Sequence, residues 1–451
     1  RAGADLDPHR RPHHRLPVPL MTPAGRASAA IEVLADIEQR KRPASEALKD
    51  WGLGHRFAGS GDRAAIGNLV FDCLRKRASA AYAMGDETPR ALVLRTLVTD
   101  WGMTPDEMSA LCDGSRFAPA PLSPAERAGL EVTLAEDVPA PIRGDYPQWL
   151  EVAFTESFGG RAAAEGAALS ARAPVDLRVN TLKAGRDKVL KSLQRLDAAP
   201  TPYAPSGMRV APREGPARSP HVEAEAGHGK GWFEVQDEGS QVAALMTGAG
   251  ARQQVIDLCA GAGGKTLALA ALMENTGQLY AYDSDRMRLR PIFERLKRAG
   301  ARNIQVLPAG EVESLTPLEG KMDRVVIDAP CTGSGVWRRR PDAKWRLSPE
   351  MLEARLGEQV AVLDSGAALV KPGGRLTYIT CSVLPRENRE QVSAFLTRHP
   401  DFDVVPWREV WAATLPSAPP DSADGSDETL LMTPLSHGTD GFFVAVLQRK
   451  A

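Results

Sequence analysis

From residue 251 onward the sequence repeats one pattern, in which a short run rich in β-branched and aromatic residues is followed by a turn and a helical segment. The predicted strands are 255–259, 278–282, 303–307, 324–328 and 375–380, and the predicted helices are 266–274, 285–299, 349–370 and 386–397. This alternation is typical of an α/β fold with a doubly wound, mostly parallel sheet. Residues 442–447 predict one more strand, after a loop at 413–427 that we expect to be mobile because it is rich in Pro, Ser, Asp and Gly.

Two smaller regions are predicted to precede this domain of residues 251–451. In 27–139 apolar residues recur with helical spacing, as at Ile66, Leu69 and Cys73, so we predict an all-α domain. Its two cysteines, Cys73 and Cys112, are expected in the core. Residues 140–250 mix helices with short strands at 176–180 and 233–237 and a loop at 205–231, which predicts a small α+β adapter.

Composition narrows the class of protein. A chain of 451 residues is long enough for two to four domains, and it lacks the run of about 18–20 apolar residues that a membrane-spanning helix needs. Five cysteines are too few, and odd in number, for a disulfide scaffold, so we expect reduced thiols and a cytoplasmic location. The net charge of -1 means that any nucleic-acid surface must be local.

The first 26 residues are predicted to be a disordered leader. Residues 1–20 are rich in Arg and His and lack the apolar core of a signal peptide. A basic arm with a function of its own is the alternative.

A glycine-rich turn follows the first strand of the predicted sheet, between Val255 and Thr266. Such a turn lets the backbone approach a ligand and offers helix N–H groups to an anion. A phosphate loop would need glycine where Cys259 stands, and a dinucleotide loop would need glycine at Thr266. The third candidate is S-adenosylmethionine, whose ribose needs an acid after the second strand, where Asp283 stands. The alternative for Asp283 is a helix cap.

Two cysteines follow two other predicted strands. Cys331 comes directly after the strand that ends at Asp328, and Cys381 directly after the strand that ends at Thr380. Ligands bind outside the carboxyl ends of strands in an open parallel sheet, so we expect both cysteines in the crevice of the glycine turn. Inert packing and redox pairing are alternatives. No His lies near either cysteine in the sequence, so we predict no metal site.

A thiolate beside a methyl donor is suited to pyrimidine chemistry. Its addition to carbon 6 of the ring makes carbon 5 nucleophilic, which is covalent catalysis. An acid close to ring N3 stabilises the developing charge, and Asp328 is placed for this role.

These stretches resemble the RsmB/Sun-type family of RNA cytosine-5 methyltransferases. The matching segments are Asp257-Leu258-Cys259-Ala260 with Gly263-Gly264-Lys265-Thr266, Asp328-Ala329-Pro330-Cys331, Thr380-Cys381-Ser382-Val383-Leu384-Pro385 with Glu387-Asn388, and Asp440-Gly441-Phe442-Phe443. The resemblance implies a Rossmann-like, seven-stranded methyltransferase sheet, with Cys381 as nucleophile and Cys331 assisting product release. It also implies that 27–139 is similar to a NusB-like RNA-binding domain and that the substrate is small-subunit (16S) ribosomal RNA.

The resemblance also implies S-adenosylmethionine as cofactor. The residues predicted to bind it are Cys259, Ala260, Gly261, Ala262, Gly263, Gly264, Lys265, Asp283, Gly310 and Asp328. Two departures concern this site. Gly261-Ala262 replaces the family's Ala-Pro, which loosens the turn, and Gly310-Glu311 stands where the family often has an Asp near the adenine.

Basic residues gather just after Cys331 and are predicted to contact RNA phosphates. They are Arg338, Arg339, Arg340, Lys344 and Arg346, with Trp337 or Trp345 available to stack on a base. The basic segment 286–302 is a second candidate, for which a solvated helix face is the alternative.

Overall we predict a monomeric RNA methyltransferase. The alternatives are a transfer RNA substrate, or a catalytically silent RNA-binding assembly factor.

Overall fold

The computed structural model describes residues 21–451. Most of the leader predicted at 1–26 lies outside the described residues. Its last part differs from the prediction, because helix α1 begins at Pro23. The Thr22 side chain accepts a hydrogen bond from Gly25 N (3.1 Å), and Pro23 occupies the first helical turn, where its missing N–H is not needed. The chain is therefore helical from residue 23.

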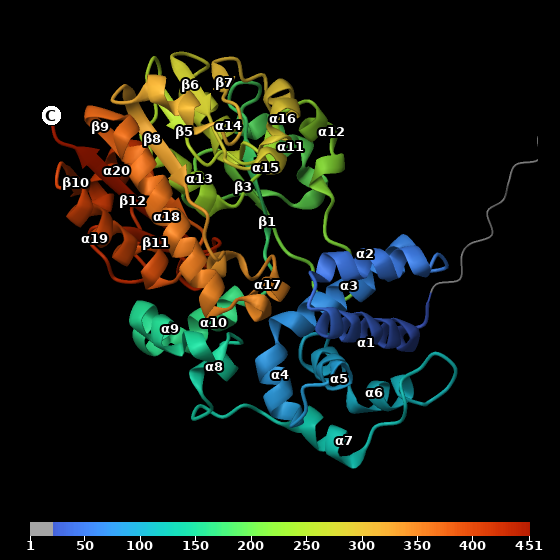
Figure 1. The fold of residues 1–451 in the computed structure, drawn as a ribbon. Coiled ribbons are helices and arrows are strands. Elements are labelled where there is room, and N and C mark those ends of the chain that lie inside the picture. Colours follow the sequence, from blue (N-terminus) through green and yellow to red (C-terminus); the bar gives the residue numbers. More distant parts are fainter. Residues whose placement is uncertain (1–20) are drawn as a thin grey trace, which may run out of the picture.

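The N-terminal region is all-α, as predicted (Figure 1). Its helices are α1 (Pro23–Arg40), α2 (Ala44–Gly54), α3 (Ser60–Arg75), α4 (Arg77–Met84), α5 (Pro89–Thr99), α6 (Pro105–Leu111) and α7 (Pro124–Glu131). Thr104 and Ser123 form capping boxes with Glu107 and Glu126, which fixes where α6 and α7 begin. Cys73 and Cys112 are buried in the shared core of these helices.

The middle region combines helices with a small antiparallel sheet. Helices α8 (Ala140–Arg143), α9 (Glu151–Phe158) and α10 (Ala162–Leu169) come first, and α11 (Arg186–Ser192) and α12 (Ala226–Gly229) follow β1 and β3 respectively. The sheet has the order β2-β3-β1-β4, in which β1 (Val175–Val179) and β4 (Phe233–Val235) are the two predicted strands. The predicted loop 205–231 instead contains β3 (Gly207–Val210), which pairs with β2 (Ala199–Pro200) and β1. Four residues are too few to show an alternation in the sequence.

The large sheet carries the order β10-β12-β9-β8-β5-β6-β7, with β11 paired to β12 alone. Its strands are β5 (Gln254–Asp257), β6 (Gln278–Ala281), β7 (Ile304–Val306), β8 (Met322–Asp328), β9 (Val370–Thr380), β10 (Phe402–Val405), β11 (Leu430–Met432) and β12 (Phe442–Arg449). Strands β5 to β9 run parallel and β12 runs antiparallel to β9, which confirms the mostly parallel methyltransferase sheet. Strands β10 and β11 were not predicted.

Helices cover both faces of this sheet (Figure 1). The helices of this part of the chain are α13 (Glu238–Leu245), α14 (Gly264–Leu272), α15 (Arg286–Leu289), α16 (Ile292–Ala299), α17 (Pro341–Arg346), α18 (Pro349–Leu369), α19 (Arg389–Arg398), α20 (Trp407–Thr414) and α21 (Pro434–His437), of which α17 packs against α3 of the N-terminal region. Apolar residues of α13, α14 and α20 form the core on one face, and those of α9, α18 and α19 form the core on the other.

One prediction in this domain needs correction. The helix expected at 285–299 is interrupted at Arg290–Pro291, because proline has no N–H to continue the hydrogen-bond ladder. In the loop at 413–427, Ser417 O and Ser426 O accept hydrogen bonds from the indole N–H groups of Trp411 (2.7 Å) and Trp407 (3.0 Å). Within residues 21–451, no helix is long and apolar enough to cross a bilayer.

Candidate active site

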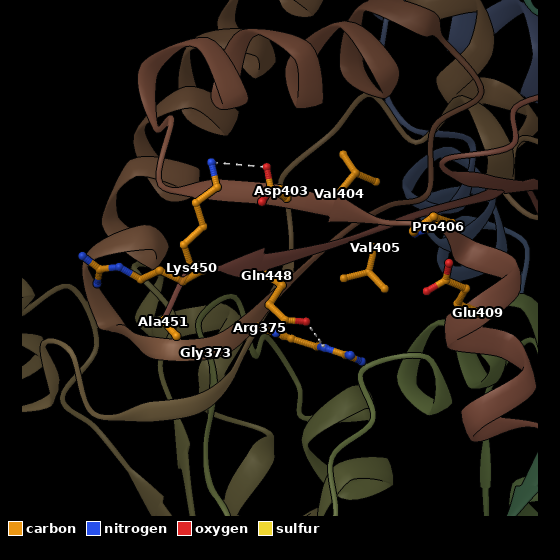
Figure 2. Close-up of a pocket in the computed structure, with 11 residues that line it drawn as sticks. Gly373, Arg375, Asp403, Val404, Val405, Pro406, Glu409, Gln448, Lys450 and Ala451 are labelled. Atoms are coloured by element: carbon orange, nitrogen blue, oxygen red, sulfur yellow. Dashed lines mark hydrogen bonds and ion pairs between the residues drawn. The ribbon is translucent and has the colours of Figure 1, made fainter.

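The carboxyl ends of β5, β6, β8 and β9 meet at one edge of the sheet, beside a cavity of about 420 Å³. The cavity is lined by Asp176, Val235, Gln236, Asp237, Ser240, Cys259, Ala260, Gly261, Ala262, Gly264, Lys265, Arg288, Arg295, Asp328, Arg339, Asp440 and Phe442. This is the edge at which ligands bind in doubly wound sheets. A second cavity, of about 350 Å³, lies at the opposite end of the strands beside Arg375, Asp403 and Lys450 and contains none of the predicted site residues (Figure 2).

Glycine conformations shape the turn between β5 and α14. Gly261 and Gly263 have φ of 50° and 86°, and a Cβ atom on Gly263 would lie 2.6 Å from Ile292 Cγ1. The buried carboxylate of Asp283 accepts hydrogen bonds from Gly261 N and Asp285 N, both at 2.8 Å. Asp283 therefore connects the turn to β6. The helix cap considered for it is instead supplied by Asp285, which accepts from Met287 N and Arg288 N.

The cavity wall fits the methionine end of S-adenosylmethionine. Helix α14 begins at Gly264 without a side-chain cap, so its first N–H groups are available to a carboxylate. Asp257, at the end of β5, is buried and accepts from Thr266 Oγ1 (2.7 Å), while its other oxygen has no hydrogen-bond partner among the described residues. Burial raises the pKa of Asp257 to about 7.

Lys265 and Asp328, which both line the cavity, form an ion pair. Lys265 Nζ, on α14, donates to Asp328 Oδ2 (2.8 Å) and to Ser240 Oγ (3.1 Å), and it lies 5.1 Å from the ring centroid of Phe442. The Lys265 side chain is 5% exposed, whereas that of Asp328 is 35% exposed. Asp328 therefore faces the cavity, while the Lys265 ammonium that pairs with it is buried.

The structure brings the two cysteines together, as the strand ends suggested. Cys331 Sγ lies 3.4 Å from Cys381 Sγ, and both residues are partly exposed, so neither is packed entirely in the core. Contact with the Cys381 sulfur, burial and the negative charge of Glu387 raise the pKa of the Cys331 thiol well above its ordinary value. Cys331 is therefore held as a thiol, not a thiolate.

Backbone contacts fix the loops that carry the sulfurs. Gly335 N donates to Cys381 O (2.9 Å), and Ser334 Oγ lies 2.9 Å from Ser382 Oγ. Gly441, at the start of β12, donates to Gly335 O (2.8 Å). A Cβ atom on Gly335 would lie 2.3 Å from Gly441 O, so glycine is required for this approach.

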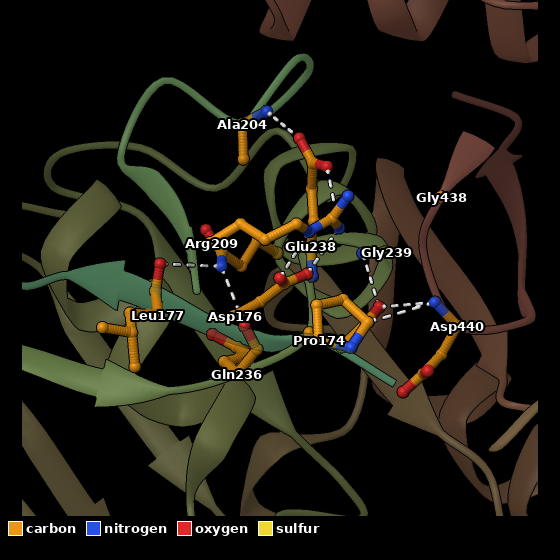
Figure 3. A network of polar contacts seen from close by, with 12 residues as sticks. Pro174, Asp176, Leu177, Ala204, Arg209, Gln236, Glu238, Gly239, Gly438 and Asp440 are labelled. Atoms are coloured by element: carbon orange, nitrogen blue, oxygen red, sulfur yellow. Dashed lines mark hydrogen bonds and ion pairs between the residues drawn. The ribbon is translucent and has the colours of Figure 1, made fainter. Parts of the chain in front are cut away.

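Most of the predicted RNA-contacting segment after Cys331 is not at the surface. Arg338 is buried between Asp440 and Asp237, and Arg339 binds the same two carboxylates together with Pro174 O (2.9 Å). Asp440 N donates to Asp237 Oδ2 (3.0 Å), and Figure 3 shows Asp440 in the same region as the pair Asp176–Arg209 and Glu238. The charges of Arg338 and Arg339 are therefore used inside the protein.

The remaining members of that segment divide between core and surface. Lys344 is fully buried and donates to Ser170 Oγ (2.8 Å) and Arg75 O (3.1 Å), and burial lowers its pKa to about 7. Arg340 is exposed, as is Arg346, which pairs with Asp342 (2.9 Å).

The two tryptophans proposed to stack on a base are also packed against protein. Trp337 is buried with its ring stacked on Phe154, and Trp345 Nε1 donates to Leu74 O (2.6 Å). The predicted RNA contacts of Arg338, Lys344 and Trp337 are therefore corrected to structural roles.

Sequence reasoning did not find several residues that line the cavity. Asp237, Asp440 and Ser240 reach it from α13 and β12, far along the chain from the glycine turn. Asp440 lay in a stretch matched to the family and Asp237 ended the predicted strand 233–237, but neither was assigned to the site. Gly310 contacts the site through its backbone, since its N–H donates to Asp283 O (3.2 Å).

Comparisons with known proteins agree with this geometry. Residues 245–448 match the family described as 16S rRNA methyltransferase RsmB/F, and residues 146–213 match the ferredoxin-like domain of RsmF/B-like methyltransferases. The chain is 33% identical over 330 residues to a protein of Synechocystis sp. named "Probable ribosomal RNA small subunit methyltransferase B", covering 72% of this chain and 71% of that protein. It is 33% identical over 322 residues to the ribosomal RNA small subunit methyltransferase B of Salmonella newport, covering 71% and 70%.

A solved structure extends the likeness to nearly the whole chain. The crystal structure of a protein designated PH0851 superposes with a TM-score of 0.71 and 25% identity over 95% of this chain and 99% of that one. The chain therefore belongs to the RsmB/F family of 16S rRNA methyltransferases and is an S-adenosylmethionine-dependent RNA cytosine-5 methyltransferase.

Proposed function

We propose that this enzyme methylates carbon 5 of a cytosine in small-subunit ribosomal RNA through a covalent bond between Cys381 and the base. The observation that carries this proposal is the 3.4 Å approach of the Cys331 and Cys381 sulfurs just after the carboxyl ends of β8 and β9, the first of which ends at the cavity-lining residue Asp328. A family member without catalytic activity would have no use for two partly exposed thiols at this edge. The ribosomal target is supported by the two relatives, which are both small-subunit methyltransferases by name.

The turn residues 259–265 would hold the methionine part of the cofactor, with the first N–H groups of α14 directed at its carboxylate. Asp283 is the acid after the second strand and would receive the ribose hydroxyls. Gly310 lies next to Asp283 at the same edge of the sheet, where its N–H donates to Asp283 O. When bound, S-adenosylmethionine supplies an electrophilic methyl group.

Cys381 is the nucleophile in this proposal. Its thiolate adds to carbon 6 of the cytosine, which makes carbon 5 electron-rich and able to take up the methyl group. Asp328 and Lys265 face the cavity as an ion pair and would bind the amino and N3 edge of the base, which limits the charge that develops on the ring. Transfer of the carbon-5 proton to a water molecule then lets the C5–H electron pair form the C5–C6 double bond, which expels the Cys381 thiolate and restores the aromatic ring. Cys331, which touches the leaving sulfur, assists this release.

The RNA strand is proposed to approach over α15 and α16, since most cations of the segment 338–346 are used internally. Arg286, Arg288 and Arg290 are exposed, and Arg288 lines the cavity. Met287 and Phe293 on the same segment are 69% and 59% exposed, and such apolar groups can stack on unpaired bases. Arg295 and Arg298 do not contribute, because they bind Glu234 (3.0 and 2.6 Å).

The test is methyl transfer from labelled S-adenosylmethionine to purified small-subunit rRNA, with transfer RNA as a parallel arm. We expect label in the rRNA as 5-methylcytosine, no turnover by Cys381→Ala, and an adduct resistant to denaturation with Cys331→Ala. Turnover by Cys381→Ala would overturn the covalent mechanism. Label confined to transfer RNA would overturn the assigned substrate.

A further inference from the structure

A buried carboxylate lies directly behind the two sulfurs and takes no part in the chemistry described so far. Glu387 follows Cys381 by six residues, in the short helical turn Pro385–Glu387, and its side chain is fully buried. It accepts hydrogen bonds from Thr332 N (2.8 Å), Thr332 Oγ1, Ser382 Oγ and Gln359 Nε2 (3.0 Å). All four donors are uncharged groups, and among residues 21–451 no lysine or arginine forms an ion pair with it, an arrangement suited to a group that only accepts hydrogen bonds.

The donors are the chain neighbours of the two cysteines. Thr332 adjoins Cys331, and Ser382 adjoins Cys381. One carboxylate therefore joins the two loops that carry the sulfurs. Gln359 Nε2, from the middle of α18, also donates to Pro330 O (2.9 Å), which holds the other side of Cys331.

The next residue, Asn388, completes the frame around Cys381. Its Oδ1 accepts from Thr380 Oγ1 (2.6 Å) and its Nδ2 donates to Ser382 O (2.9 Å), so both neighbours of Cys381 are fixed from within the protein. The Tyr378 hydroxyl donates to Glu387 O (2.7 Å) and anchors the turn to β9.

We infer that Glu387 is a positioning residue that sets the separation of the two sulfurs by joining the loops of Cys331 and Cys381, and that it makes the surroundings of the two cysteines chemically unequal. The inference rests on the catalytic roles proposed above. Its geometric part follows from the hydrogen bonds to Thr332 and Ser382. Its electrostatic part follows because an unneutralised negative charge close to Cys331 opposes a second one on that sulfur. Glu387 also raises the pKa of the Cys331 thiol, in addition to the effects of Cys381 and burial.

The decisive variant is Glu387→Gln, which keeps the shape of the side chain and removes its charge. Glu353→Gln is the matched control, since Glu353 is an exposed carboxylate that pairs with Arg386, the chain neighbour of Glu387. Two quantities are measured for the full chain. The first is the rate at which iodoacetamide alkylates Cys331 and Cys381 as a function of pH, read for each cysteine by mass spectrometry. The second is kcat and KM for methyl transfer.

We expect Glu387→Gln to shift the alkylation profile of Cys331 to lower pH, so that Cys331 reacts roughly tenfold faster at pH 8. We expect kcat to fall by about 100-fold with KM for RNA unchanged, because a small misplacement of reacting groups has costs of this order. Glu387→Asp, which keeps the charge, should retain the alkylation profile of Cys331.

An unchanged Cys331 profile in Glu387→Gln would overturn the inference, even if the variant is less stable or less active, because a purely structural role predicts that result. The alkylation measurement needs no methyl transfer. If the wild-type protein transferred no methyl group, the proposed function would fail while the effect of Glu387 on the thiols would still be measured.

Discussion

Two groups of arginines flank the cavity and look alike in the sequence, yet the fold uses them in opposite ways. Arg338 and Arg339 are turned inward onto Asp440 and Asp237, whereas Arg286, Arg288 and Arg290 are exposed to solvent. The difference arises because the fold places Asp237 and Asp440 against Arg338 and Arg339. A run of basic residues therefore predicts a nucleic-acid surface only when no carboxylate meets it in three dimensions. The predictions below test this contrast, from the largest expected effect to the smallest.

Asp440→Ala should cause the largest loss of stability. It leaves Arg338 buried without its main counter-charge, and removal of one partner from a buried ion pair costs about 3–5 kcal/mol. Urea unfolding of the full chain measures the change. Arg340→Ala, beside the pair but exposed, should change the free energy of unfolding by less than about 0.5 kcal/mol. Equal effects of the two substitutions would remove the distinction between the inward and outward arginines.

Gly335→Ala probes the same inward region through its backbone. The new Cβ would meet Gly441 O, which has no flexible end to move aside, so the loop of Cys331 must shift. We expect a loss of about 1–3 kcal/mol in stability, together with a fall in kcat. Gly357→Ala, on α18 where a Cβ meets nothing within 4 Å, is the control and should be neutral or slightly stabilising. A variant with normal turnover would show that the Gly335–Gly441 contact is not needed.

Lys344 should give the protein a pH-dependent stability. Its pKa is lowered to about 7 in the folded state, against about 10.4 in the unfolded chain. Between these values the unfolded state alone keeps the proton, so stability should rise with pH from 7 to 10, by up to about 1.4 kcal/mol per pH unit. Below pH 7 both states are protonated and this contribution is constant. Lys344→Met should flatten the rise in urea titrations at several pH values, and an identical slope in the variant would contradict the assignment.

Substitutions in the outward group should affect RNA binding and leave stability unchanged. Arg286→Gln with Arg290→Gln removes two exposed cations, and each lost phosphate contact lowers the salt dependence of log K by about 0.7 for single-stranded RNA. Binding titrations at several salt concentrations therefore measure the change directly. Arg355→Gln, exposed on α18, serves as control. An unchanged salt slope in the double variant would place the RNA elsewhere.

The sequence was sufficient to predict the sheet, the strand ends and the meeting of Cys331 with Cys381, because these depend on local alternation and on the topology of parallel strands. It did not show that Arg338 is buried, since its partner Asp440 lies 102 residues away in the chain. The short strand β3 and the break at Pro291 were missed for local reasons, the first from its length and the second from the missing N–H of proline. Local sequence patterns do not reveal the carboxylates that pair with an arginine from a distant part of the chain.

The contacts of Gly335 with Gly441 and of Arg338 with Asp440 cannot form until residues 440 and 441 have been synthesised. Arg338 is synthesised about 5–20 s before Asp440, at about 5–20 residues per second for the 102 residues between them. During that interval Arg338 lacks the carboxylate of Asp440 and Gly335 lacks its contact with Gly441. The enzyme is thus expected to acquire its working catalytic loop only late in translation, and nascent chains that stop before residue 440 should be inactive.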